Sequence, residues 1–344
     1  MNEGGRTINE LINEWVRKYL SGESLGDIAE KAGVNHETVR KYLKMSGVTM
    51  RSRSEAISLA WYKRCPKKPF NGSCEEKAYM TMFVTGDCST WRFPSSVRVS
   101  ASTTHYAQID LFHDIFNRYC KVSKSPKFNK KRQTYEYGLS CPLDHSFDFL
   151  CPKPTTIPEE IRESEKNLLC GLEGYADAEG SIFPYCSRGH TYAAFVLHSK
   201  DYSILTTFYE TLKKLGYNPY LNTYKNPIYR NYARLGFSGE SAIVMLKRLK
   251  FHHRERAEAK QLVLKLHGLR WNKTKPEYAA FRGKIREETR QCMEEAREDY
   301  ILRHGQPHLQ EMNQTIPEDI KDDVGSLASL VLHDNIMEYI GGKI

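Results

Sequence analysis

The sequence predicts an α+β protein in which two copies of one module follow a small all-α domain. Three observations favour this fold class. A helical stretch with small residues ends in two acids near residue 180, and a degraded copy of it lies 92 residues upstream. The chain after each copy continues with the same order of helical and strand-like patterns. Three short helical patterns with capping residues precede both copies.

Residues 1–64 are predicted to form a helix-turn-helix domain. An apolar stripe marks the first helix, Ser24 is an N-cap for the second, and Asn35 is an N-cap for the third. Ala29, Gly33 and Val39 have the spacing at which a small residue and a turn glycine let two helices cross. The alternative is a three-helix bundle with a solvated charged face. We favour DNA binding, with the third helix entering a major groove through His36, Arg40, Lys41 and Lys44.

A further helix is predicted over residues 51–64, and a linker over residues 65–74. Proline, glycine and serine cluster in the linker. The first module then spans 75–154, the second spans 155–270, and a helical extension spans 271–344. The extension contains a long charged helix over 275–304 and an apolar helix over 324–340.

The second module begins with the stretch from Leu168 to Ile182. Small residues on one helical face let another helix approach closely, and Gly180 is expected to end the helix in a left-handed conformation. Glu179 then lies at a helix C-terminus, where the dipole disfavours an anion. A nearby cation would offset this cost, so the residues indicate a metal-site candidate. The alternative is a helix-packing seam with an incidental terminal acid.

The degraded copy lies between Tyr79 and Thr90. Aligning the two stretches places Asp87 over Glu179. Met82 replaces the small residue at Gly174, and a cysteine at 88 replaces the terminal glycine. The acid persists while the packing residues change, which favours a site that includes both acids.

Each module is predicted to contain a helix, two strands, a helix, two strands and a helix (αββαββα). In the first module the strand-like runs are 95–102 and 135–140, and residues 106–120 have helical spacing. In the second module the corresponding strand-like runs are 181–185, 192–197, 220–224 and 229–237, with a helix over 202–215. Such a module has a sheet with one open face.

The stretch 172–180 resembles the signature of the LAGLIDADG homing endonuclease family, and residues 79–90 resemble a degraded copy. The resemblance covers residues 75–270 and implies two pseudo-symmetric αββαββα repeats that form a saddle over double-stranded DNA. It implies that Asp87 and Glu179 are the catalytic residues and bind Mg²⁺, or another divalent cation such as Mn²⁺. Asp177 belongs to the signature but is not the usual ligand. A single chain with both repeats would act as a monomer in intron or intein mobility.

Basic residues are the other expected site components. Family members often place a cation near the metal from the region that closes a repeat, and the candidates here are Lys250, Arg254 and Arg256. The densest basic segment, 121–132, is predicted to be an edge or hairpin loop that contacts DNA. The expected DNA-binding residues of the two modules are Lys124, Lys127, Lys130, Lys131, Arg132, Lys225, Arg230 and Arg234. The alternatives are a solvated loop for 121–132, packing of the tyrosines for 220–234 and a solvated helix start for 247–256.

Composition supports a polyanionic partner and excludes several classes. The net charge is +9, from 51 Lys and Arg against 42 Asp and Glu. No apolar run reaches the ~20 residues that span a bilayer, and no secretory signal is recognisable. The nine cysteines are scattered without a C-x-x-C pair, so we expect a reducing cytoplasm, at the nucleoid or wherever the target DNA lies.

Three functions compete at this stage. The first is a site-specific, metal-dependent DNA endonuclease that uses one acid from each signature helix. The second is a catalytically inactive DNA-binding regulator on the same scaffold, which the changes at Met82 and Cys88 favour. The third is an RNA-splicing maturase that binds intron RNA, since a basic surface also suits RNA.

Overall fold

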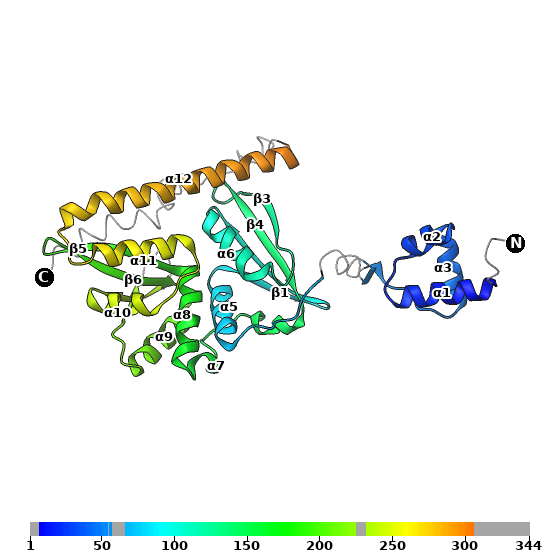
Figure 1. Ribbon diagram of the computed structural model, residues 1–344, viewed down its shortest axis with the longest axis horizontal. Helices are drawn as coiled ribbons and strands as arrows, with labels where there is room; N and C mark the ends of the chain where they lie inside the picture. The colour runs from blue at the N-terminus through cyan, green and yellow to red at the C-terminus, as the bar shows by residue number, and fades with distance from the viewer. Residues whose placement is uncertain (1–6, 54, 57–65, 225–231, 306–344) are drawn as a thin grey trace. The chain divides into compact units, whose positions relative to one another are not determined.

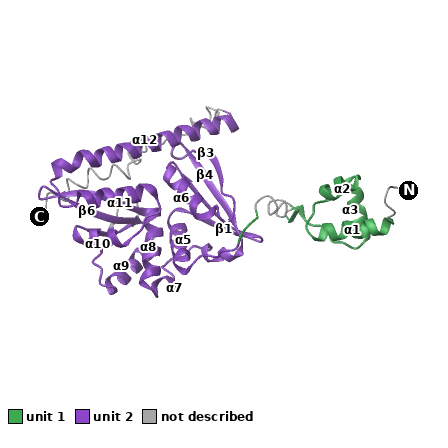
Figure 2. Ribbon diagram, viewed as in Figure 1, with its two compact units in different colours: residues 1–68 green, residues 69–344 purple. Residues whose placement is uncertain are grey.

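The chain was analysed as a computed structural model, which describes residues 7–53, 55–56, 66–224 and 232–305. The chain divides into two compact units, 1–68 and 69–344 (Figure 2). The boundary falls within the predicted linker. Lys225 and Arg230, the predicted apolar helix 324–340 and most of the predicted helix 51–64 lie outside the described residues.

Unit 1 contains the three helices that the capping residues predict: α1 (Ile8–Leu20), α2 (Leu25–Ala32) and α3 (His36–Met45). Gly33 ends α2 in the left-handed region, with a φ of 65°, where a side chain would be strained. The helices share one apolar core whose buried residues are Trp15, Tyr19, Ile28, Ala29, Val39 and Leu43.

The N-cap of α2 provides a stability test for unit 1. The Ser24 Oγ accepts from the Asp27 N–H at 3.0 Å, and the Asp27 carboxylate accepts from the Ser24 N–H at 3.2 Å. Ser24→Ala removes one half of this reciprocal pair, so we expect unit 1 to lose about 1 kcal/mol of unfolding free energy. Urea denaturation followed by the fluorescence of Trp15 would measure the loss. An unchanged midpoint would contradict the prediction, and Ser24→Thr, which keeps the capping hydroxyl, is the matched control.

Unit 2 contains two copies of the same order of elements (Figure 1). The first repeat has α5 (Cys74–Asp87), β1 (Ser89–Phe93), β2 (Ser96–Thr103), α6 (Tyr106–Phe116), β3 (Ser123–Asn129), β4 (Thr134–Leu143) and the 3₁₀ helix η1 (His145–Leu150). The second has α8 (Glu165–Glu179), β5 (Gly180–Ser187), β6 (His190–Ser199), α9 (Tyr202–Lys214), β7 (Tyr220–Tyr224), β8 (Tyr232–Ser238) and α10 (Glu240–Arg248). Outside the repeats are α7 (Glu159–Arg162), α11 (Arg254–Leu266) and α12 (Trp271–His304).

Each repeat forms one four-stranded antiparallel sheet, with the orders β1-β2-β4-β3 and β5-β6-β8-β7. We call them sheet A and sheet B. One prediction for sheet A was wrong and one was incomplete. The region 121–132 is mostly strand β3, with only its end in a hairpin turn, and the predicted pair of strands before α6 was given a range only for β2. Strands β1 and β3 are short edge strands with mostly polar or exposed residues, so neither has a clear hydrophobic alternation.

The two signature helices, α5 and α8, pack directly against each other (Figure 1). A Cβ on Gly174 would overlap the carbonyl oxygen of Tyr79, and a Cβ on Gly86 would lie 2.5 Å from the Ala178 Cβ. Met82, which aligns with Gly174, is fully buried beside Gly171 instead. The helix crossing is therefore asymmetric, and this explains why one copy tolerates a large residue where the other requires glycine.

The turn from each signature helix into its first strand differs from the expectation. Gly180 has a φ of −81° and a ψ of 151°, so it is extended rather than left-handed. Cys88 is also extended, with a φ of −105° and a ψ of 157°. Because neither position needs a left-handed residue, cysteine replaces glycine in the first repeat without backbone strain.

Helix α12 extends along both repeats (Figure 1). At its start the Thr274 hydroxyl lies 2.6 Å from that of Thr191 in β6, and near its end Asp299 accepts from the Tyr137 hydroxyl in β4 at 2.9 Å. It therefore ties sheet B to sheet A. Among the helices that the structure describes, α12 included, none is both long enough and apolar enough to cross a membrane.

Candidate active site

The crossing of α5 and α8 brings their C-terminal acids, Asp87 and Glu179, to the same end of the helix pair. The Cβ position of Gly86 lies 3.2 Å from the Cγ of Glu179, so the last residues of the two helices are adjacent. The close packing of the two helix backbones therefore brings the two predicted acids together.

Both carboxyl groups resist ionisation. Burial, together with the charge of Asp87, raises the pKa of Glu179 to about 7. Burial also raises the pKa of Asp87 to about 6, although Arg256 and Lys153 act in the opposite direction. By surface exposure, however, Asp87 is exposed and Glu179 is half-buried, so solvent screens the charge of Asp87 and burial acts more strongly on Glu179. An added cation at this end of the helices would stabilise both anions.

Two basic side chains lie near the acids. Lys153, in the segment between the repeats, donates from its Nζ to the carbonyl oxygen of Cys88 at 2.8 Å. Arg256, in the first turn of α11, is the second cation, and the charges of Lys153 and Arg256 lower the pKa values of both Asp87 and Glu179. Each repeat is thus followed by one cation that approaches the acid pair.

Polar side chains from α6 complete the surroundings of Asp87. Gln108 donates from its Nε2 to the Asp87 carboxylate at 2.9 Å. At the N-terminus of the same helix, His105 Nδ1 lies 3.0 Å from the Glu255 carboxylate, which is buried and adjacent to Arg256. Burial opposes ionisation of Glu255, but the His105 hydrogen bond and nearby charges hold its pKa below the usual value. This contact joins the first repeat to α11.

Two further acids of α8, Asp177 and Glu173, hold the segment that leads to Arg256. Asp177 is fully buried and accepts from the Tyr79 hydroxyl at 2.7 Å and from the His252 N–H at 2.8 Å. Glu173 accepts from the Lys250 N–H at 2.6 Å. These carboxylates fix the start of α11 against α8, which is a structural role distinct from that of Glu179.

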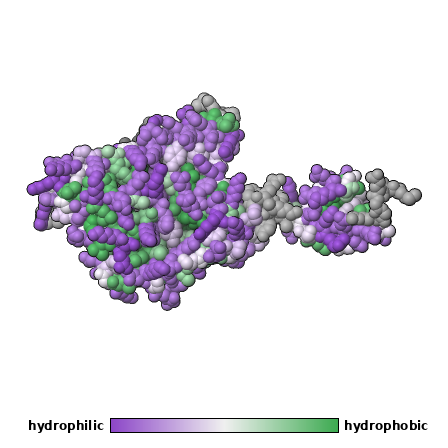
Figure 3. Space-filling view, in the orientation of Figure 1, coloured by the Kyte–Doolittle hydropathy of each residue, from purple (hydrophilic) through white to green (hydrophobic). Residues whose placement is uncertain are grey.

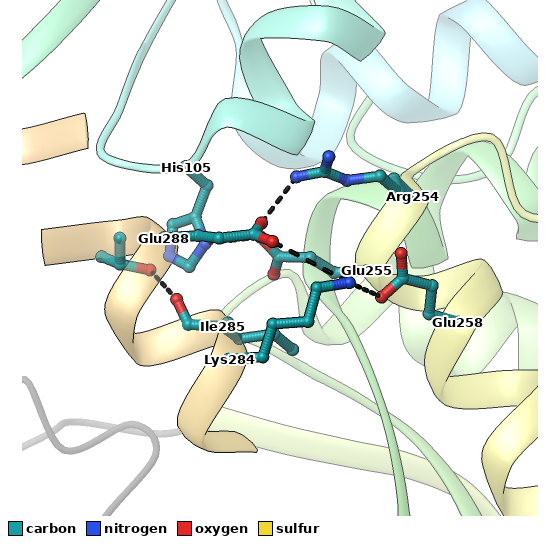
Figure 4. A network of polar contacts seen from close by, with 8 residues as sticks. His105, Arg254, Glu255, Glu258, Lys284, Ile285 and Glu288 are labelled. Atoms are coloured by element: carbon teal, nitrogen blue, oxygen red, sulfur yellow. Dashed lines mark hydrogen bonds and ion pairs between the residues drawn. The ribbon is translucent and has the colours of Figure 1, made fainter. Parts of the chain in front are cut away.

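A network of ion pairs between α11 and α12 also supports the first turn of α11 (Figure 4). Arg254 pairs with Glu288 of α12 at 2.6 Å, and Lys284 of α12 pairs with Glu258 at 2.9 Å. Helix α12 therefore contacts the helix that carries Arg256 through two ion pairs.

Of three comparisons with known proteins, only the one with solved structures found matches. No protein-family model matches the chain, and no curated protein matches it. A solved structure of I-DmoI in complex with DNA and Ca is 16% identical, with 55% of this chain and 97% of that chain covered and a TM-score of 0.37. A mutant of I-SmaMI is 9% identical, with coverages of 61% and 98% and a TM-score of 0.39. The N-terminal LAGLIDADG domain of DUF199/WhiA is 16% identical, with coverages of 51% and 83% and a TM-score of 0.34.

The deciding observation is the duplicated topology around one closely packed pair of helices that both end in an acid. Unit 2 has the LAGLIDADG fold. The crossing helices α5 and α8 are its two LAGLIDADG helices, and the two four-stranded sheets around them confirm the fold predicted from the sequence.

The sequence predicted three basic candidates for a place beside the LAGLIDADG acids. Of these, the structure brings Arg256 close to the acids. Arg254 turns away to Glu288, and Lys250 contributes its backbone N–H to Glu173. The sequence analysis missed Lys153 and Gln108. Lys153 could have been noticed as a lone lysine within a proline-rich linker. Gln108 could not, because a glutamine on an amphipathic helix does not indicate a functional site.

The predicted DNA-binding residues fall in different environments. His36, Arg40, Lys41 and Lys44 are exposed on α3, with Val39 and Leu43 buried on its other side. In sheet A, Lys127 and the turn residues Lys130, Lys131 and Arg132 are exposed. Lys124 instead stacks on the Tyr137 ring, at 3.7 Å from its centroid, on the helix-covered side. Arg234 lies 5.7 Å from the ring of Tyr220 on sheet B.

The donor set of the LAGLIDADG acids suits Mg²⁺. Within the described ranges, no group of three or more His, Cys, Asp or Glu residues is close enough to enclose a metal. Mg²⁺ keeps several waters and is usually held by one or two carboxylates plus substrate phosphates. Asp87 and Glu179 match this requirement, because each brings a carboxylate whose ionisation needs a neighbouring cation.

The raised pKa of Glu179 predicts a pH-dependent cost to stability. The folded chain holds this proton up to about pH 7, whereas an unfolded chain loses it near the ordinary value of 4.5. The free energy of unfolding therefore falls as pH rises through this window. We expect Glu179→Gln to melt at a higher temperature than the wild type at pH 8 and at the same temperature at pH 4, in metal-free thermal melts. A difference that does not vary with pH would contradict this explanation.

Proposed function

We propose that this protein is a metal-dependent endonuclease that cuts double-stranded DNA at a specific site. The observation that carries the proposal is the assembly of Asp87 and Glu179, one from each LAGLIDADG helix, with Lys153 and Arg256 beside them. Divalent ions bound there would activate water and stabilise the leaving oxygen of a phosphodiester.

The residues of this chain have separable roles in the proposed reaction. Asp87 and Glu179 would hold the divalent ion, and Gln108 orients the Asp87 carboxylate. Lys153 follows the first repeat and Arg256 follows the second, so each is suited to neutralise charge on the phosphate at one strand. Glu173 and Asp177 keep the segment before Arg256 in place.

Two surfaces, one in each unit, are proposed to bind DNA. The exposed basic face of α3 in unit 1 suits a major groove, and Lys127, Lys130, Lys131 and Arg132 give sheet A a basic end. One chain contains both acids, so we propose that it acts as a monomer. The predicted setting, the nucleoid of a cytoplasm, is part of the same proposal.

The test is cleavage of a randomised duplex DNA library by the full-length protein, with Mg²⁺ and with a chelator. Enriched cut sites that appear only with Mg²⁺ would support the proposal and supply the target. Retention of one sequence without cleavage would instead favour a DNA-binding regulator, and preferential binding of structured intron RNA would favour a maturase.

A further inference from the structure

The two sheets of unit 2 present different outward faces, although the repeats share one topology. In each sheet one face packs on the helices of its own repeat, and the outward face is the opposite one. In sheet A the inward residues of β2 are Val97, Val99 and Ala101, all buried. In sheet B the inward residues include Phe195 and Leu197, which belong to the main core.

The outward face of sheet A combines an exposed arginine, partly exposed serines and two exposed aromatic rings. Arg98 lies over the Phe93 ring, 5.0 Å from its centroid, and its cross-strand neighbour Trp91 is 49% exposed. Ser100 donates to Ser140 at 3.2 Å, which shows that their hydroxyls share this face. Serine hydroxyls and an arginine fork are groups that contact base edges in a major groove. This face therefore has the composition of a base-reading surface.

The outward face of sheet B is apolar at its centre. Ala194 is 3% exposed and Val196 is 0% exposed, and they form a cluster with Phe183. Tyr185, Tyr220 and, from α12, Tyr278 pack against this cluster. A Cβ on Gly236 would approach to 2.5 Å from the Tyr220 ring, so that ring lies across the sheet. The centre of this face has apolar packing in place of exposed hydrogen-bonding groups.

A pair-by-pair comparison makes the difference specific. The cross-strand pair Trp91 and Arg98 in sheet A corresponds to Phe183 and Ala194 in sheet B. The pair Ser89 and Ser100 corresponds to Ser181 and Val196. At both positions the β2 residue is polar in sheet A and its β6 counterpart is apolar. A difference repeated at successive outward positions affects the surface as a whole.

We propose that the two sheets contribute unequally to target recognition. Sheet A reads base edges, whereas sheet B makes fewer base contacts because its outward centre is packed against tyrosines, one of them from α12. The sequence information read by unit 2 is then concentrated in the half of the target beneath sheet A. This inference rests on the DNA-binding part of the proposed function and not on cleavage.

Binding selection without metal tests the inference independently of cleavage. Full-length protein selects duplexes from a randomised library in EDTA, and bound sequences are compared for the wild type, Arg98→Ala and Asn222→Ala. Asn222 is exposed and pairs with Arg234 on the outward face of sheet B, so it is the matched polar control. We expect Arg98→Ala to relax one or two adjacent positions by about 10-fold. Asn222→Ala should leave the selected sequence unchanged.

Two further measurements make the outcome decisive. Arg40→Ala identifies the positions that depend on unit 1, and these are removed from the comparison. Equal relaxation by Asn222→Ala and Arg98→Ala, or no selected sequence for the wild type, would overturn the inference. Cleavage by the same preparation in Mg²⁺ would show that the proposed nuclease function survives that failure. If no cleavage occurs but Arg98→Ala alone relaxes the selected sequence, the proposed nuclease function would be rejected and the inference about the two sheets would stand.

Discussion

Replacing Glu179 by glutamine is expected to slow DNA cleavage by about 10²-fold or more, while the affinity for uncut DNA changes little. The substitution keeps the shape of the side chain and removes the negative charge that would hold the divalent ion in the proposed reaction. Loss of a group that only supports a metal ligand already costs about 10–100-fold, so loss of the ligand itself should cost at least as much. Cleavage of the selected target in Mg²⁺ and its binding in EDTA would separate the two effects.

Asp87→Asn should have a comparable effect, and the double variant should be little slower than either single variant. Residues that act on one reaction as a unit give non-additive losses. Glu210→Gln is the matched control, because Glu210 is an exposed glutamate on α9. Cleavage by Glu179→Gln within about threefold of the wild-type rate, which is under 1 kcal/mol of barrier, would show that this acid is not required.

The LAGLIDADG pair could be found from the sequence because its requirements are local. Small residues on one helical face and an acid at the helix end are properties of a single short stretch, and Asp87 was located by its spacing from Glu179. The structure adds why the copies differ: Met82 fills space beside Gly171 rather than at the closest helix contact. Such a difference depends on how two helices cross and has no signature in either helix alone.

The supporting residues could not be predicted in the same way. Gln108 reaches Asp87 from another helix, and Lys153 approaches from the segment between the repeats. Their roles come from tertiary contacts between residues that are 21 and 65 positions apart in the chain. The choice among Lys250, Arg254 and Arg256 likewise depended on which face of α11 meets the acids. The sheet asymmetry was also hidden, since Tyr278 belongs to a helix outside both repeats.

Close approach of the LAGLIDADG helices predicts that one added methyl group will be severely destabilising. In Gly174→Ala the new Cβ would overlap the Tyr79 carbonyl oxygen, and it would also lie 3.1 Å from the backbone nitrogen of Phe83. These are backbone atoms, so relief requires the helices to separate. Overpacking a rigid contact costs about 1–3 kcal/mol and occasionally more. We expect about 3 kcal/mol, or a fall of about 6–12 °C in melting temperature for a unit of this size.

The same chemical change at Gly283 should have the opposite sign. Gly283 is an exposed residue inside α12, and a Cβ there would meet nothing within 4 Å. Alanine in a helix interior is favoured over glycine by about 0.5–1 kcal/mol, so Gly283→Ala should raise the melting temperature slightly. Calorimetric melts of both variants and of the wild type would measure the contrast. Because Gly174 also sets the separation of Asp87 and Glu179, Gly174→Ala should lose cleavage even at temperatures where it remains folded. Full activity together with an unchanged melting temperature would show that the helices tolerate a wider crossing, and that the acids do not depend on it.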